Sequence, residues 1–153
     1  MKRLQWLFVP LAVALLACGG AEPPADTGDA TPATAKAAAA APTAGDLEYD
    51  RLTANWSDGA LELCGRGLRD ALGTRDLVQG ALDGVKDSDN KAAAEIADAR
   101  HWLTQGDDRM KEIRPALEAG TCDPKVTTAL DEVWQFYVKA GTSAVQAGQI
   151  AGS

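Results

Sequence analysis

The chain has 153 residues, of which 15 are lysine or arginine, 22 are aspartate or glutamate and one is histidine. This acidic balance provides no basic surface for the phosphate backbone of a nucleic acid, so nucleic-acid binding is excluded as an expected function. It also excludes electrostatic adhesion to anionic lipid headgroups, so any membrane association must have another source.

Residues 1–17 have the organisation of a bacterial export signal. Lys2 and Arg3 precede a mostly apolar run from Leu4 to Leu16 that is too short to span a bilayer, and small residues follow it. The end of the segment, Leu15-Leu16-Ala17-Cys18, resembles the lipobox of bacterial lipoproteins. The resemblance implies attachment of a diacylglyceryl group to Cys18, cleavage before that residue and acylation of the new amino terminus. The alternative is an ordinary secretory signal with a chance cysteine.

The expected membrane anchor is therefore the lipid on Cys18. Each buried methylene contributes about 0.8 kcal/mol, and two or more acyl chains anchor a protein stably. The lipoprotein resemblance implies three such chains. Removal of residues 1–17 takes away two basic residues and leaves 13 basic against 22 acidic side chains, so charge adds nothing to this anchor. Gly19 stands where an aspartate would retain an enterobacterial lipoprotein at the inner membrane, and by that analogy we expect the outer membrane.

Residues 18–45, the lipidated cysteine and the linker that follows it, are expected to form a disordered tether. Residues 19–45 comprise 11 alanine, four proline, four glycine, four threonine and four charged residues. None of these side chains can seed a hydrophobic core. A short helix over residues 36–41 is the alternative, but such a segment is too short for an isolated helix to persist. The folded domain is then expected over residues 46–153.

Residues 46–153 contain the larger apolar and aromatic side chains. The segment is long enough for one small domain. Its apolar positions follow helical spacing rather than the alternation of strands, so we expect an all-α bundle of three or four helices. Trp56, Trp102 and Trp134 fall on three different predicted helices, which favours a shared aromatic core.

The first helix is predicted over residues 47–72. Its apolar stripe follows four-residue steps and consists of Leu52, Trp56, Ala60, Cys64 and Leu68. Gly73 is placed to end this helix, and Thr74 to cap a short second helix that reaches about Lys86. One long helix bent at Gly73 is the alternative. The face of the second helix would contain Leu77, Val78, Ala81, Leu82 and Val85. Gly80 and Gly84 are expected to allow close contact between helices.

The third helix is predicted to start near Lys91, after capping side chains at residues 87–90, and to continue through Gly106 to Ile113. Pro115 should end or kink it. The last helix begins with Asp123 as N-cap and Pro124 at the first helical position. Its predicted buried stripe consists of Val126, Leu130, Val133, Tyr137, Ala140 and Ala144.

Cys64 and Cys122 are the cysteines that remain once Cys18 is assigned to lipid attachment. In an exported protein an even pair is expected to form a disulfide. The bridge would staple the first helix to the start of the last and close a loop of about 58 residues, which contributes at most about 4 kcal/mol. A redox-active or metal-binding pair would need Cys-x-x-Cys spacing or a second histidine, and the sequence has neither.

Asp98 and His101 are the candidate metal ligands, since a three-residue step places both on one helix face. They form only half a site, and a solvated helix edge is the simpler interpretation. His101 and Met110 lie about 900° apart around an ideal helix, on opposite faces, so they cannot share one haem iron. The single histidine has no recognisable partner for a catalytic triad. We therefore expect no catalytic residue, no cofactor and no metal.

The sequence thus predicts a non-enzymatic lipoprotein of the cell envelope that displays a disulfide-stapled helical domain on a flexible tether. Its expected partners are the membrane, through the lipid, and an envelope or extracellular protein or component. The alternatives are a periplasmic carrier of a small ligand or metal that uses the bundle, and a structural spacer. A contiguous exposed apolar patch would favour partner binding, whereas an internal cavity with converging polar groups would favour the carrier.

Overall fold

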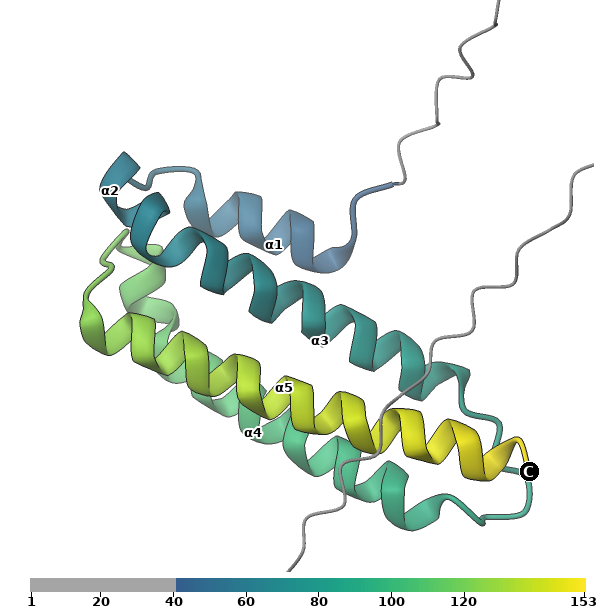
Figure 1. Cartoon of the computed structure of the whole chain (residues 1–153). Helices are drawn as coiled ribbons and strands as arrows, with labels where there is room; N and C mark the ends of the chain where they lie inside the picture. The colour runs from purple at the N-terminus through teal and green to yellow at the C-terminus, as the bar shows by residue number, and fades with distance from the viewer. Residues whose placement is uncertain (1–40) are drawn as a thin grey trace, which may run out of the picture. The chain divides into compact units, whose positions relative to one another are not determined.

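The computed structural model describes residues 41–153, which form an all-α bundle (Figure 1). In chain order the elements are α1 (Ala44–Thr53), α2 (Asp58–Ala60), the π-helical segment η1 (Leu61–Gly65), α3 (Arg66–Gly84), α4 (Ala93–Glu118) and α5 (Pro124–Ala151). The described residues contain no strand, so the predicted all-α bundle is confirmed. Cys18, the export signal and the tether up to residue 40 lie outside the described residues.

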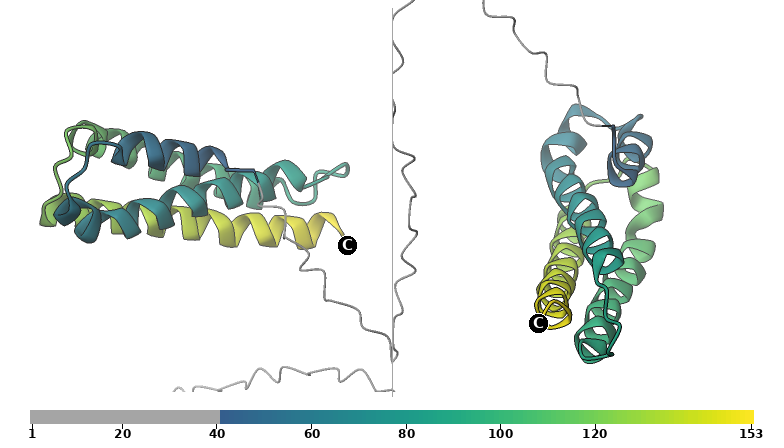
Figure 2. Two further views of the ribbon diagram at one scale, coloured as in Figure 1. Left: turned by 90° about the horizontal axis from the view of Figure 1, so that it is seen from above. Right: turned by 90° about the vertical axis from the view of Figure 1, so that its right-hand side faces the viewer.

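The long helices α3, α4 and α5 run side by side, and α1 covers only part of their length (Figures 1 and 2). α5 packs along both α4 and α3, whereas α1 packs against α3 with a smaller contact to α4. The four-helix half of the domain is the part that α1 covers, together with η1 and the turn between α4 and α5. The three-helix half is the remainder of the domain, where only α3, α4 and α5 lie side by side, and it ends at the loop between α3 and α4. Among the described helices, none combines the length and apolar composition that a bilayer crossing requires.

The core is built on the inward stripe of α5, where the prediction is confirmed. The stripe residues Val126, Leu130, Val133, Tyr137, Ala140 and Ala144 are all buried. Asp123 caps α5 as predicted, because its carboxylate accepts hydrogen bonds from the N–H groups of Lys125 and Val126. The predicted cap of α4 is wrong, because α4 begins at Ala93 without a side-chain cap, and Asp87 instead accepts hydrogen bonds from the N–H groups of residues 91 and 92 in the preceding turn. The predicted four-residue stripe from Leu52 to Leu68 is buried as well, although its residues do not share one helix.

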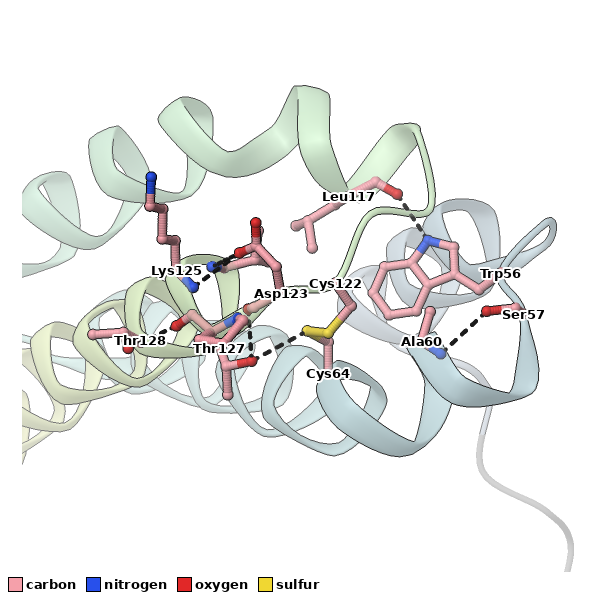
Figure 3. Close-up of a disulfide and its surroundings, with 12 residues drawn as sticks. Trp56, Ser57, Ala60, Cys64, Leu117, Cys122, Asp123, Lys125, Thr127 and Thr128 are labelled. Atoms are coloured by element: carbon pink, nitrogen blue, oxygen red, sulfur yellow. Dashed lines mark hydrogen bonds between the residues drawn. A yellow bond between two sulfur atoms is a disulfide. The ribbon is translucent and has the colours of Figure 1, made fainter.

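The predicted first helix is wrong in its continuity, because the chain turns after Thr53. Ser57 caps a new helix by accepting a hydrogen bond from the N–H of Ala60 at 3.3 Å. Between the two helices Trp56 enters the core, and its indole Nε1 donates to the carbonyl oxygen of Leu117 at 2.7 Å (Figure 3). α1 and α3 therefore run in opposite directions (Figure 1). The stripe stays buried because both helices face the same core.

The predicted helix end at Gly73 is also wrong, because α3 runs without a break from Arg66 to Gly84. A Cβ atom at Gly73 would meet no atom within 4 Å, and its backbone does not adopt the left-handed conformation of a helix-ending glycine. The continuous helix sets the phase of the residues that follow. Val78 is buried at 3% exposure, whereas its neighbour Leu77 is 76% exposed. The predicted apolar face of residues 74–86 is therefore only partly buried.

Pro115 does not end α4, which contains this residue and continues to Glu118. A proline removes one hydrogen bond from a helix, and near the end of α4 few further turns depend on it. The chain leaves the helix at Gly120, whose φ of 66° is the left-handed conformation that glycine adopts after a helix. The N–H of Thr121 then donates to the carbonyl oxygen of Ala116 at 2.9 Å, which completes this helix-ending motif.

The folded unit begins earlier than the predicted boundary at residue 46. Thr43 caps α1 and forms a reciprocal capping box with Asp46. Gly45 is buried, and its N–H donates to the Asp76 carboxylate of α3 at 2.6 Å. Residues 43–45, which were predicted to belong to the tether, are therefore part of the domain.

The three tryptophans of the domain do not share one core, which corrects that prediction. Trp56 is buried, Trp102 is half-buried and Trp134 is 44% exposed. Trp134 follows the core residue Val133 directly, so it points about 100° away from the inward stripe of α5. The buried aromatic side chain of α5 is instead that of Tyr137.

Cys64 and Cys122 form the predicted disulfide, with Cα atoms 6.1 Å apart (Figure 3). Cys64 lies in η1 and is fully buried, and Cys122 lies in the turn between α4 and α5. The hydrogen bond from Trp56 to Leu117 joins nearby parts of the same two segments. The covalent bond and this hydrogen bond together close the four-helix half of the domain.

α4 and α5 approach closely at Gly106, which is buried. A Cβ atom at this position would lie 2.4 Å from Cε1 of Tyr137. Because this separation is far shorter than any real contact, only glycine leaves room for the tyrosine ring.

We expect Gly106→Ala to destabilise the domain and Gly73→Ala to stabilise it. Alanine gains about 1 kcal/mol over glycine inside a helix, but overpacking against Tyr137 costs about 1 to 3 kcal/mol. At Gly73 no neighbouring atom opposes the gain. Urea unfolding of both variants and of the unchanged protein measures the difference. Equal stabilisation by the two substitutions would show that the ring of Tyr137 does not rest on Gly106.

Candidate functional site

The two candidate metal ligands, Asp98 and His101, lie at an edge of α4. The Asp98 carboxylate accepts a hydrogen bond from the Ser143 hydroxyl of α5 at 2.6 Å. His101 is exposed, and its ring lies edge-on to Trp102 with centroids 5.2 Å apart. Within residues 41–153, no three His, Cys, Asp or Glu side chains are grouped so that they could hold a metal ion. The group that α5 brings to Asp98 is thus a hydroxyl rather than a second metal-binding side chain.

A polar network joins all four helices of the four-helix half. Asp107 of α4 accepts a hydrogen bond from the Tyr137 hydroxyl of α5 at 2.9 Å. Its Oδ1 also lies 2.8 Å from Nε of Arg75 on α3, as an ion pair without the alignment of a hydrogen bond. Glu48 of α1 pairs with Arg75 at 3.8 Å and also with Arg114 of α4. No spacing along the chain reveals this network, because its members come from four separate helices.

Burial and the neighbouring carboxylates together set the protonation states of Tyr137 and Arg75 in the network. Burial raises the pKa of Tyr137, and the neighbouring Asp107 carboxylate raises it further, so the phenol remains a neutral hydrogen-bond donor. Burial disfavours the charged form of Arg75, but the neighbouring Asp107 and Glu48 carboxylates outweigh it and raise the pKa of this guanidinium. The hollow beside these groups has a volume of about 80 Å³, against at least about 300 Å³ for ordinary ligand pockets. We therefore assign the network to holding the helices together.

An open groove between α3 and α5 lies on the outside of the bundle. Four hollows of about 360, 530, 220 and 450 Å³ follow one another along it from the disulfide to the loop after α3. At the floor of the 220 Å³ hollow the two helices meet closely, since a Cβ atom at Gly141 would lie 3.3 Å from Cγ2 of Val78, and both residues line this hollow. We call this surface the α3–α5 groove.

Two rows of residues line the α3–α5 groove, and both follow alternating four- and three-residue steps. The α3 stripe, which begins in η1, consists of Leu63, Gly67, Asp70, Thr74, Leu77, Ala81 and Gly84. The α5 stripe consists of Thr127, Asp131, Trp134, Val138, Gly141, Val145 and Gly148. This is the seven-residue repeat with which helices pack side by side in bundles and coiled coils.

The groove collects most of the exposed large apolar side chains of residues 41–153. Seven such side chains are exposed, and the five on the two stripes are Leu63 (64%), Leu77 (76%), Trp134 (44%), Val138 (41%) and Val145 (58%). Single exposed apolar residues are common on proteins, whereas several gathered along one groove favour an interaction surface.

Glycines border the groove in the three-helix half. Gly80 and Gly84 were expected to allow close contact between helices, but a Cβ atom at either position would meet nothing within 4 Å, and the same holds for Gly148. That expectation is wrong for contacts within the described domain. Each of these glycines costs about 1 kcal/mol relative to alanine inside a helix, without a packing contact that offsets the cost.

Charge is distributed unevenly along the groove. Glu62, Asp70 and Asp131 lie at the end near the disulfide, and Lys86 lies at the opposite end. Asp70 is paired with Arg66 at 3.7 Å. Glu62 and Asp131 have no ion-pair partner among residues 41–153. The disulfide end of the groove is therefore acidic.

The α5 stripe is hard to find from the sequence because α5 carries two interleaved repeats. The inward repeat is almost entirely apolar, whereas the outward repeat is diluted by glycine, threonine and aspartate. A signal is nevertheless present in the sequence, since Trp134, Val138 and Val145 are separated by four and seven residues and so belong to one seven-residue repeat. On α3, the predicted break at Gly73 assigned Leu77 the wrong phase and so placed it in the core.

No family model, curated protein or solved structure matches this chain.

We expect the free energy of unfolding to fall above about pH 10 through Tyr137. Because its pKa is raised in the folded chain, the unfolded chain loses this proton first. The stability that the buried phenol contributes is present below the unfolded pKa and is lost as the pH rises, by at most about 1.4 kcal/mol per pH unit. Urea unfolding from about pH 8 to pH 11 measures this fall. Tyr137→Phe should reduce it, and an identical pH dependence in both proteins would contradict the assignment.

Proposed function

We propose that this protein is a non-enzymatic, lipid-anchored lipoprotein of the bacterial cell envelope that binds another protein through the α3–α5 groove. The observation that carries the proposal is the pair of exposed seven-residue stripes along the groove. Burial of exposed apolar area is favourable by about 25 cal/mol per Å², so a partner that covers the stripes gains directly from them.

The proposed anchor is the lipid on Cys18. The lipobox-like residues 15–18 support it, and Gly19 favours the outer membrane by analogy with enterobacterial lipoproteins. A disordered tether between Cys18 and the cap at Thr43 would have an average reach of roughly 30 Å. The domain could then meet a partner at a distance from the membrane that holds the lipid.

The residues that line the groove provide contact area rather than chemically reactive side chains. No charged residue lines the middle section of the groove, and the charged side chains lie at the two ends. The middle section is lined by Thr74, Leu77, Val78, Ala81, Tyr137, Val138, Gly141 and Val145. An apolar centre with charges at its edge is the usual composition of a protein-binding surface. For this reason we propose a macromolecular partner rather than a substrate.

Two observations disfavour the alternative of a small-ligand or metal carrier that uses the interior of the bundle. The hollow beside the polar network has a volume of only about 80 Å³. The Asp98 carboxylate, one of the two candidate metal ligands, is already hydrogen-bonded to the Ser143 hydroxyl. The large hollows all lie in the α3–α5 groove, which is open to solvent.

A photo-reactive amino acid in place of Leu77 tests the proposed groove. Leu77 is 76% exposed at the centre of the α3 stripe, so the replacement leaves the core intact. We expect irradiation of cells that make this variant to yield one discrete adduct with another protein.

The matched control places the same photo-reactive amino acid at Leu47, which is 59% exposed on α1 and lies outside the groove. It should yield no such adduct. Equal labelling from both positions, or none from Leu77, would refute the groove as the binding surface.

The lipid anchor is tested separately by Cys18→Ser. We expect this variant to lose lipid attachment and to appear in the soluble or the unprocessed fraction, because the acidic chain has no electrostatic affinity for headgroups. Membrane fractionation with metabolic labelling by a fatty acid provides the measurement. A variant that is still processed, labelled and membrane-bound would overturn the assignment of Cys18.

A further inference from the structure

Resting on the proposed function, we infer that the segment bound in the α3–α5 groove is an amphipathic helix whose basic residues lie at the disulfide end, beside Glu62 and Asp131.

The helical form of the partner follows from the spacing of the stripes. Each stripe covers three seven-residue repeats, from Leu63 to Gly84 and from Thr127 to Gly148, or about 30 Å along its helix. Two such rows on neighbouring helices form the holes that receive the side chains of a third helix. A segment that binds by adding a strand to a sheet is disfavoured, because residues 41–153 contain no strand edge with which it could pair.

The lining residues change in size along the groove. Leu63 and Trp134 project at the disulfide end, whereas Gly80, Gly84 and Gly148 leave the other end open. A bound helix therefore needs small side chains opposite Trp134 and larger ones opposite the glycines. This gradient gives the partner helix a fixed direction in the groove.

The charge at the disulfide end specifies basic residues in the partner. Glu62 and Asp131 flank the exposed Leu63 and Trp134 and have no ion-pair partner among the described residues. An uncharged helix would partly remove these carboxylates from water without replacing the lost interactions. A lysine or arginine on the helix pairs with them, and an arginine can in addition stack on the ring of Trp134.

A second copy of this chain does not meet the same requirement. Neither stripe contains a basic residue, and Arg66 at the groove edge is already paired with Asp70. Antiparallel copies would offer only Lys86 to each pair of carboxylates. The described domain also carries more acidic than basic side chains, so two copies repel each other.

Three synthetic helical peptides of about three heptads each test the inference. They share the same apolar positions and differ only in the terminal heptad, which carries lysine, glutamine or glutamate at its flanking positions. Binding of each labelled peptide to the full-length lipidated protein in detergent is followed by fluorescence anisotropy. We expect the lysine peptide to bind roughly fivefold more tightly than the glutamine peptide at low salt, and the glutamate peptide to bind most weakly. The lysine advantage should fade at about 0.5 M salt.

Two double variants locate the effect. Glu62→Gln with Asp131→Asn should abolish the lysine advantage and should bind the glutamine peptide as tightly as the unchanged protein or more tightly, because neutral amides cost less to remove from water than carboxylates. Asp50→Asn with Asp83→Asn removes the same charge from exposed positions outside the groove and should retain the advantage. Circular dichroism melting confirms that each variant is folded.

The outcomes separate this inference from the proposed function. Equal binding of all three peptides, with a uniform loss in Leu77→Ser, would overturn the basic partner and leave the groove as a binding surface. Absence of peptide binding, together with a discrete protein adduct from position 77, would overturn the helical partner alone. An adduct between two copies of this chain would overturn the inference in favour of self-association. Absence of any adduct would remove the proposed function itself.

Discussion

The contact between the ring of Tyr137 and the backbone at Gly106 is the constraint on which the rest of the structure depends. It sets how closely α4 and α5 approach and how α5 is rotated about its own axis. With the ring inside the bundle, the phenol reaches Asp107, which also holds Arg75 of α3. Glu48 then ties α1 to the same arginine. Through Asp107, Arg75 and Glu48, this packing of one aromatic residue on one glycine is connected to all four helices of the four-helix half.

The same rotation determines which side chains of α5 stay exposed. Successive residues of a helix are separated by about 100°, so Trp134 and Val138 cannot share the inward direction of Tyr137. On α3 the unbroken helix has a corresponding effect, because Val78 packs inward and Leu77 is left on the surface. The exposed stripes are therefore a consequence of core packing. Their large apolar side chains keep 41 to 76% of their surface exposed in the described domain, which is why we propose that a partner covers them.

The two halves of the domain differ in the interactions that hold their helices together. The four-helix half has the Cys64–Cys122 disulfide, the hydrogen bond from Trp56 to Leu117 and the ionic network around Asp107. Away from these links, the three-helix half has small residues along its outer surface. The α3–α5 groove extends over both halves. In our proposal the partner helix meets an acidic, strongly cross-linked end and a glycine-lined end, and this asymmetry orients it.

The sequence by itself determined the features that depend on neighbouring residues. Asp123 followed by Pro124 marks the start of α5, and the apolar spacing after it identifies the core stripe, because capping and helical periodicity are local properties. The cysteine count identified the disulfide in the same direct way. The tertiary structure alone decided where the chain reverses and which faces are covered. The break after α1 depends on the hydrogen bond that the Trp56 indole donates to the carbonyl oxygen of Leu117, 61 positions away. The α3–α5 groove exists because α1 and α4 cover other faces of the bundle, and no residue spacing within one helix can specify that.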